Sequence, residues 1–216
     1  MSYKIIIADD HPLARGALHQ TVAKLYPNAS ISEASSLEHL IEQISFAPNV
    51  DLVLLDLSMP GVRGFSGLLY LRSQHPNIPI AICSATEDAT TIRRALDFGA
   101  SGFIPKSSSL DIMSLAIHSI MMGEVWIPED IDLNVLDKDE DMIRRMSSLT
   151  PQQMRVLMMV SEGLLNKQIA YRLSVSEATI KAHVSAILQK LNVESRTQAV
   201  IIANRLGVVQ NADLAV

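Results

Sequence analysis

Three carboxylates, a hydroxyl and an ammonium group in the first half of the chain are the side chains best suited to chemistry. Asp9, Asp10 and Asp56 supply the carboxylates, and Ser84 and Lys106 the other two groups. Converging carboxylates repel one another unless a cation lies among them, and Mg²⁺ takes oxygen ligands of this kind. A carboxylate can also accept a phosphoryl group as a nucleophile, with a lysine and a hydroxyl binding the new phosphate oxygens.

These five residues lie at the ends of short apolar runs that alternate with helical patterns. The predicted strands cover residues 4–8, 31–34, 51–57, 78–83 and 102–104, and the predicted helices cover 12–25, 37–45, 65–74, 88–98 and 110–122. Strict alternation predicts a parallel sheet with helices on both faces. Ligands of such sheets bind outside the carboxyl ends of the strands. We therefore expect all five side chains at one edge of the sheet.

The rest of the chain has a different pattern. Residues 126–148 include the acidic run DKDED and predict a solvated linker that is partly helical. Beyond it we predict only helices, over residues 151–162, 166–173, 177–191 and 196–206, with Ser176 and Ser195 capping the last two. A short helix, a turn and a capped second helix form a helix-turn-helix, in which the second helix enters the major groove of DNA.

Charge supports the same division of the chain. The net charge of −5 disfavours a nucleic-acid partner for the whole chain, yet residues 149–216 carry 7 basic and 4 acidic side chains. No apolar run reaches the roughly 18 residues of a membrane span, and we expect no membrane association. The single cysteine, Cys83, excludes an intrachain disulfide and a multi-cysteine zinc site. These features predict a cytoplasmic protein.

Two sets of motifs resemble known families. Asp9-Asp10, the run LLDLSMPG at 54–61, Ser84-Ala85 and the run GFIPK at 102–106 resemble the receiver domain. The sequence NKQIA, followed by LSVSEATIKAHV and ILQKL, resembles the DNA-binding domain of LuxR-type regulators. Together they are similar to the NarL/FixJ family of two-component response regulators.

The resemblance implies a fold and a division into domains. The implied fold is an α/β flavodoxin-like (CheY-like) doubly wound five-stranded parallel sheet, joined to a separate all-α four-helix LuxR-type helix-turn-helix domain. We expect the receiver over residues 1–125, an acidic linker over 126–148 and the DNA-binding domain over 149–216. A regulator of this family is not an enzyme, although its receiver takes phosphate onto its own aspartate and slowly autodephosphorylates.

The resemblance also implies roles in the receiver. Asp56 resembles the phosphoacceptor. The implied direct Mg²⁺ ligands are Asp10, Asp56 and the backbone carbonyl of Ser58, with Asp9 acting through water. Lys106 resembles the phosphate-binding lysine, and Ser84 and Phe103 resemble the pair that shifts when phosphate binds. The donor of the phosphoryl group would be a sensor histidine kinase.

For the helical domain we expect contacts with promoter DNA. The predicted contact residues are Asn166, Lys167, Ser176, Thr179, Lys181, Ala182, Ser185, Lys190 and Arg196. Those near the start of the second helix are suited to base edges, whereas the others are suited to phosphates. In the family the last helix pairs two DNA-bound subunits, which implies a homodimer on activation, paired half-sites, and Val200 and Ile201 as interface candidates.

The sequence departs from the family patterns at three places. Pro105 precedes Lys106, whereas many receivers have a proline after the lysine. The sequence therefore leaves open whether the usual cis peptide bond follows Lys106. Gln152-Gln153 replaces the usual Arg-Glu pair after Thr-Pro, so an ion pair to the second half of the domain is expected to be missing. Ser185 stands where some relatives carry a base-reading lysine, so target sequences do not transfer.

Three other functions were weighed. A magnesium phosphohydrolase would need a second acid two residues beyond its nucleophile, where this chain has Ser58. A LuxR-type sensor of a small ligand is opposed by the strand-end acids and by the low aromatic content of 4%. A phosphorylation-independent DNA-binding regulator with a vestigial receiver stays open as the alternative.

Overall fold

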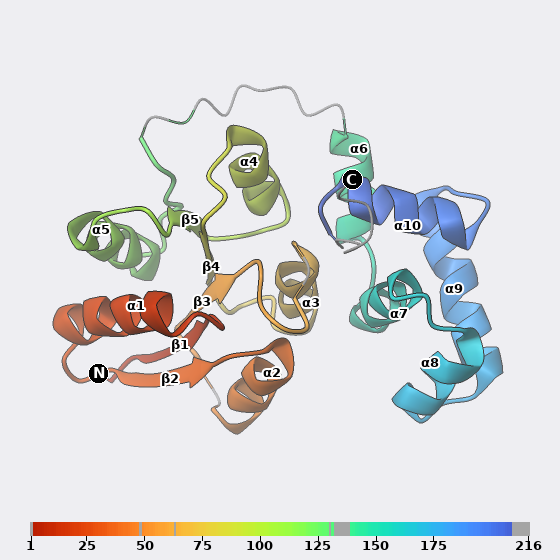
Figure 1. Cartoon of the computed structure of the whole chain (residues 1–216), viewed down its shortest axis with the longest axis horizontal. Coiled ribbons are helices and arrows are strands. Elements are labelled where there is room, and N and C mark those ends of the chain that lie inside the picture. The colour runs from red at the N-terminus through yellow and green to blue at the C-terminus, as the bar shows by residue number, and fades with distance from the viewer. Residues whose placement is uncertain (1, 48, 63, 130, 132–138, 209–216) are drawn as a thin grey trace.

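A five-stranded parallel sheet forms the centre of the N-terminal unit (Figure 1). The computed structural model describes residues 2–47, 49–62, 64–129, 131 and 139–208. The strands are β1 (Lys4–Ala8), β2 (Ser30–Ala34), β3 (Leu52–Asp56), β4 (Ile80–Ser84) and β5 (Gly102–Pro105), in the order β2-β1-β3-β4-β5. Every residue of β3 and β4 is buried, as expected for parallel strands covered on both faces.

Helices cover both faces of this sheet. They are α1 (Pro12–Leu25), α2 (Leu37–Phe46), α3 (Ser66–Gln74), α4 (Ala89–Asp97) and α5 (Leu110–Met121). Side chains of α1 and α5 share one apolar cluster with the sheet, whereas α2, α3 and α4 pack in the cluster on its other face. Ser36 caps α2, since its hydroxyl accepts from the backbone N–H of His39. The predicted doubly wound fold is therefore confirmed.

The C-terminal unit is helical in its described part. Its helices are α6 (Glu140–Ser147), α7 (Pro151–Ser161), α8 (Asn166–Leu173), α9 (Glu177–Leu191) and α10 (Arg196–Arg205). Helix α7 begins with a capping box in which Thr150 and Gln153 satisfy each other's backbone N–H groups. Between α8 and α9 the chain turns at Ser174, whose φ of 53° is left-handed. The structure thus has the predicted helix-turn-helix.

The predicted linker contains a helix whose position the sequence did not define. Helix α6 lies within it and buries Ile143 and Met146. Residues 132–138 of the predicted linker, including Asp137, lie outside the described residues. Within the part of the chain that is described, no helix is both long and apolar enough to cross a membrane.

The segment after α5 returns along the outer side of β5. Gly102 and Trp126 form an isolated parallel bridge, in which the Phe103 N–H donates to the Trp126 carbonyl at 3.0 Å. The Trp126 N–H donates to the Ser101 carbonyl at 3.3 Å. The linker therefore starts from the edge of the sheet, next to Phe103.

Candidate phosphoacceptor site and DNA-binding face

One ammonium group joins two buried carboxylates at the carboxyl end of the sheet. Asp9 follows β1, Asp56 ends β3 and Lys106 follows β5. The Nζ of Lys106 lies 2.8 Å from Oδ2 of Asp9 and 2.9 Å from Oδ2 of Asp56. The two aspartate side chains are only 0% and 2% exposed. The parallel topology thus brings together residues from three strands, as predicted.

Burial and charge act in opposite directions on these groups. Burial raises the pKa of Asp56 above its ordinary value, and the Asp9 carboxylate adds to the rise. Hydrogen bonds from Lys106 and the Ser58 backbone lower it only in part. Burial lowers the pKa of Lys106, but its contacts with Asp9 and Asp56 outweigh burial, so the net shift is upward. The site holds more negative than positive charge, which favours an additional cation.

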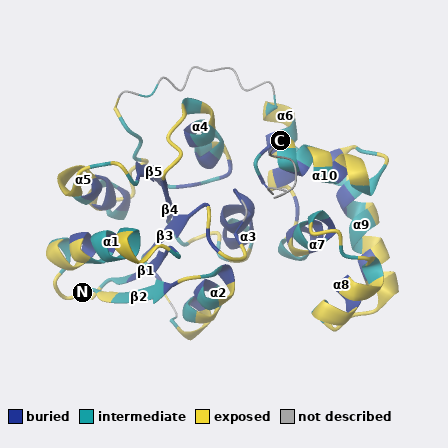
Figure 2. Cartoon of the chain, in the orientation of Figure 1, coloured by how far each residue is buried: buried dark blue, intermediate teal, exposed yellow. Residues whose placement is uncertain are grey.

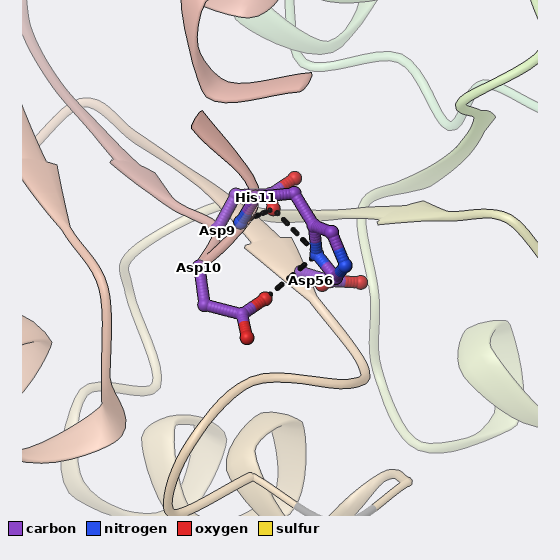
Figure 3. A group of neighbouring side chains, drawn as sticks. All are labelled: Asp9, Asp10, His11 and Asp56. Atoms are coloured by element: carbon purple, nitrogen blue, oxygen red, sulfur yellow. Dashed lines mark hydrogen bonds and ion pairs between the residues drawn. The ribbon is translucent and has the colours of Figure 1, made fainter. Parts of the chain in front are cut away.

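Asp10 and His11 complete a cluster that can hold a metal ion (Figure 3). One ligand atom each from Asp9, Asp10, His11 and Asp56 lies within 4.8 Å of the others. The His11 backbone N–H donates to Oδ1 of Asp9 at 2.8 Å, and its Nδ1 lies 2.8 Å from Oδ1 of Asp10. The three carboxylates offer the hard oxygen donors that Mg²⁺ takes, so the residues fit this ion.

From the sequence, a helix start is favoured for His11 over a contact beside the acids. It does stand at the N-terminus of α1, but its side chain makes no cap hydrogen bond and lies beside Asp10 instead. Its position directly after the two aspartates was the available signal. Because Asp9 is held by both His11 and Lys106, its carboxylate is the most constrained of the three.

Ser84 and Phe103 lie on neighbouring strands beneath the site. Ser84 is 3% exposed, and its Oγ accepts from the Thr86 N–H at 3.2 Å. Phe103 is completely buried. The Lys106 N–H donates to the Ser84 carbonyl at 2.8 Å, which ties the end of β5 to the end of β4. The described residues contain no cis peptide bond, so the bond between Lys106 and Ser107 is trans.

The start of α9 presents the expected base-reading side chains to solvent. Thr179, Lys181, Ala182 and Ser185 are all exposed, as is Lys167 on α8. Figure 2 shows exposed residues along α8 and α9, which lie on the side of the C-terminal unit away from the sheet. The Lys181 ammonium meets only Glu177 at 3.1 Å, a surface pair one helical turn away. The receiver therefore does not cover this helix.

Other predicted contact residues are engaged within the protein. Lys190 donates to the Ser148 carbonyl at 2.7 Å and to Oε1 of Gln153 at 2.9 Å. Arg196 donates to the Leu164 carbonyl at 2.9 Å. These two cations hold helices together, and the structure does not group them with the exposed side chains of α9. The Lys190–Gln153 hydrogen bond takes the place of the ion pair that was expected to be missing.

The two remaining predicted contacts lie at helix starts. The Ser176 hydroxyl accepts from the Thr179 N–H at 3.1 Å and so caps α9. Asn166 is the first residue of α8 and is half-buried. Both lie near the exposed face, and the Ser176 side chain also fixes the start of α9.

The fold and the two sites define a response regulator that carries a helix-turn-helix domain. Residues 5–118 match the response regulator receiver domain family, and residues 147–203 match the bacterial regulatory proteins of the luxR family. The chain belongs to the response regulators with a LuxR-type DNA-binding domain, the architecture of NarL-type transcriptional regulators.

Known relatives span nearly the whole chain. The glycerol metabolism activator of Pseudomonas putida is 41% identical over 213 residues, covering 93% of this chain and 95% of that protein. The nitrate/nitrite response regulator NarL of Escherichia coli is 31% identical over 201 residues, covering 91% and 93%. The solved Salmonella typhimurium RcsB response regulator has a TM-score of 0.57 at 22% identity, covering 94% and 98%, and shows the same fold.

Proposed function

We propose that a sensor histidine kinase phosphorylates Asp56 and that this event controls binding of the C-terminal domain to promoter DNA. The observation that carries the proposal is the contact of Lys106 with both Asp9 and Asp56, 2.8 and 2.9 Å from its Nζ. A buried carboxylate that faces a lysine and two further acids suits phosphoryl transfer better than a structural role. We assign the receiver to residues 1–125, the linker to 126–148 and the DNA-binding domain to 149–216.

In the proposed reaction an oxygen of Asp56 forms a bond to phosphorus. The bond between phosphorus and the donor imidazole nitrogen breaks, and that nitrogen keeps the electron pair. Lys106 and Ser84 bind the phosphoryl oxygens, and Phe103 shifts together with Ser84. Water later hydrolyses the aspartyl phosphate slowly, which resets the regulator without a second protein.

We propose Mg²⁺ as the cation of this site. Asp10, Asp56 and the backbone carbonyl of Ser58 would hold it directly, and Asp9 through water. The ion would neutralise charge as the phosphoryl group approaches Asp56. The exposed position of Ser58 and the clustering of Asp9, Asp10 and Asp56 support this ligand set.

For the DNA contacts we propose two groups. Thr179, Lys181, Ala182 and Ser185 would read base edges, whereas Asn166, Lys167 and Ser176 would contact the backbone. Lys190 and Arg196 would contact phosphates with donors that their internal contacts do not use. A homodimer formed through α10 would bind paired half-sites about one helical turn apart. Such a regulator works in the cytoplasm.

The test is intact mass after incubation with Mg²⁺ and a small acyl phosphate. We expect one phosphoryl adduct on the native protein and none on Asp56→Asn. The matched control is Asp111→Asn, which removes an exposed carboxylate on α5 and should keep the adduct. An adduct on Asp56→Asn would refute the assignment. No adduct from either the acyl phosphate or a phosphorylated histidine kinase would favour the vestigial receiver.

A further inference from the structure

The receiver and the helical unit are docked on each other through one side of the sheet. Helix α7 lies against α3 (Figure 1), and one apolar cluster continues from the α2–α4 side of the sheet into the C-terminal helices. The Phe65 N–H donates to the Gly207 carbonyl at 2.8 Å. A Cβ atom at Gly64 would lie 1.7 Å from that carbonyl oxygen, so the two backbones are in direct contact.

Asp139 of the linker joins the two units by charge. Its Oδ2 lies 3.2 Å from Nη2 of Arg94 on α4 and 3.1 Å from Nε of Arg205 on α10. The Arg205 guanidinium also contacts the other oxygen, Oδ1. Arg94 in turn donates to the Arg205 carbonyl at 2.9 Å. The Asp139 and Arg94 side chains are 11% and 15% exposed, whereas the Arg205 side chain is 63% exposed, so only the Arg94 half of this contact is shielded from water.

The position of Asp139 at the start of α6 supports its role in joining the two units. It occupies the N-cap of α6, where an aspartate ordinarily accepts a hydrogen bond from the backbone N–H groups of the first turn. Its side chain makes no such bond. The carboxylate instead faces arginines from both units, which is the arrangement of a tie between them rather than of a helix cap.

The docked surface is suited to separation. A cavity of about 270 Å³ lies between the receiver and α7, lined by Leu37, Tyr70 and Met158 among others. This space is partly open to solvent, so the two units do not pack against each other at interior density here. The contact therefore resembles an interface between domains, for which relative motion is the default expectation.

We propose that Asp139 is a latch that holds the DNA-binding domain docked on the α3–α4 side of the receiver, and that phosphorylation of Asp56 releases it. The second part rests on the proposed function. Helix α4, which carries Arg94, begins at Ala89 shortly after Ser84, so a shift of Ser84 toward a phosphoryl group would act on the segment that leads into this helix. Release frees the DNA-binding domain from a fixed orientation.

This latch differs from a cover over the recognition helix. Lys181 and its neighbours at the start of α9 are exposed in the docked form, and Ile201 on α10 is 58% exposed. The start of α9 therefore stays accessible to DNA in the docked form. It instead fixes how each DNA-binding domain is oriented, which decides whether two copies can reach paired half-sites together.

The experiment compares Asp139→Asn with Asp141→Asn in the unphosphorylated full chain. Asp141 lies in the same helix and pairs only locally with Arg145, so its loss removes the same charge without touching the latch. We expect hydrogen exchange in α3 and α7 to rise about 5-fold or more in Asp139→Asn, with a larger radius of gyration in X-ray scattering, and no change in Asp141→Asn. Equal exchange in the two variants would overturn the latch.

A second variant tests the latch without changing Asp139, whose replacement could also affect the N-terminus of α6. Arg94→Gln leaves the linker intact and should raise exchange in α7 as Asp139→Asn does; an unchanged exchange would also overturn the latch. Wild-type protein whose mass shows the phosphoryl adduct should match Asp139→Asn. If such protein stays docked, the coupling to Asp56 is wrong. Failure to form the adduct counts against the proposed function instead, because the first comparison uses unphosphorylated protein.

Discussion

The strand-end site and the start of α9 each depend on a lysine, but the two lysines are held differently. Lys106 is 18% exposed and lies between two buried carboxylates. Lys181 is 66% exposed and faces one surface glutamate of its own helix. The first lysine balances charge within the fold, whereas the second is exposed to solvent. The same residue type thus balances buried charge at one end of the molecule and, under the proposed function, contacts DNA at the other.

Replacement of Lys106 is the change with the largest expected effect. Lys106→Ala leaves Asp9 and Asp56 buried without their shared cation, and removal of one partner of a buried ion pair costs about 3 kcal/mol or more. We expect this loss in the free energy of unfolding by urea, with part of it recovered on addition of Mg²⁺. Lys24→Ala, which removes an exposed lysine of α1, is the control. Equal stability of the two variants would contradict the role of Lys106.

Replacement of Lys181 should weaken DNA binding and leave stability almost unchanged, in contrast to the stability loss expected for Lys106→Ala. Lys181→Ala is expected to weaken binding to a selected DNA site by about 1–3 kcal/mol, the range of a good base contact. Its free energy of unfolding should change by less than about 0.5 kcal/mol, because the side chain is exposed. Fluorescence anisotropy with labelled DNA and urea unfolding measure the two effects. A Lys181→Ala variant that unfolds more easily but binds DNA normally would contradict the contrast between Lys181 and Lys106.

Lys167 on α8 separates phosphate contacts from base contacts. Lys167→Ala should weaken binding by a similar factor on selected and unselected DNA, and lower the slope of log K against log salt by about 0.9. Titrations at several salt concentrations give this slope. Lys24→Ala again serves as control, since its ammonium lies on the receiver. A loss confined to the selected sequence would assign Lys167 to base reading.

The smallest expected effect concerns Glu33 of β2. Hydrogen bonds from His19 and Arg15 hold the pKa of Glu33 below its usual range. Its stabilisation is therefore complete above the ordinary glutamate pKa, about 4.3, and is lost as the pH falls through the lower folded value. Glu33→Gln should cost less than about 1 kcal/mol at pH 7, because the pair is partly exposed.

Urea unfolding of Glu33→Gln and wild type at pH 7 and near pH 3 tests this assignment. The difference in free energy between the two proteins should shrink at the lower pH. Glu42→Gln, an exposed residue of α2, should show no such difference at either pH. A cost that is the same at both values would mean that the charge of Glu33 is not what stabilises the contact.

The strand-end site was predictable because one topological rule positions all of it. Asp9, Asp56 and Lys106 each end or follow a strand, and parallel strands bring these positions to one edge. The helices were predictable from capping residues such as Ser176 and Ser195, whose local chemistry needs no tertiary contact. For His11 the sequence favoured a helix start, which is also correct, over a place beside the acids.

What the sequence could not supply are contacts made across elements. A lysine near the end of a long helix has the same local pattern whether it meets a phosphate or, as Lys190 does, a carbonyl and Gln153. The acidic run around Asp139 predicted a solvated linker, and only docking brings Arg94 and Arg205 to it. Such contacts depend on how separate elements are placed relative to one another, which no local pattern encodes.

The bridge between Trp126 and β5 has a consequence for association. β5 ends the described sheet, and an edge strand with unpaired backbone groups invites pairing with another chain and aggregation. Hydrogen bonds to Trp126 satisfy part of this edge. A second molecule could extend the sheet here only by displacing the segment that leads into the linker. Continuous sheets between molecules are therefore disfavoured on this side of the receiver.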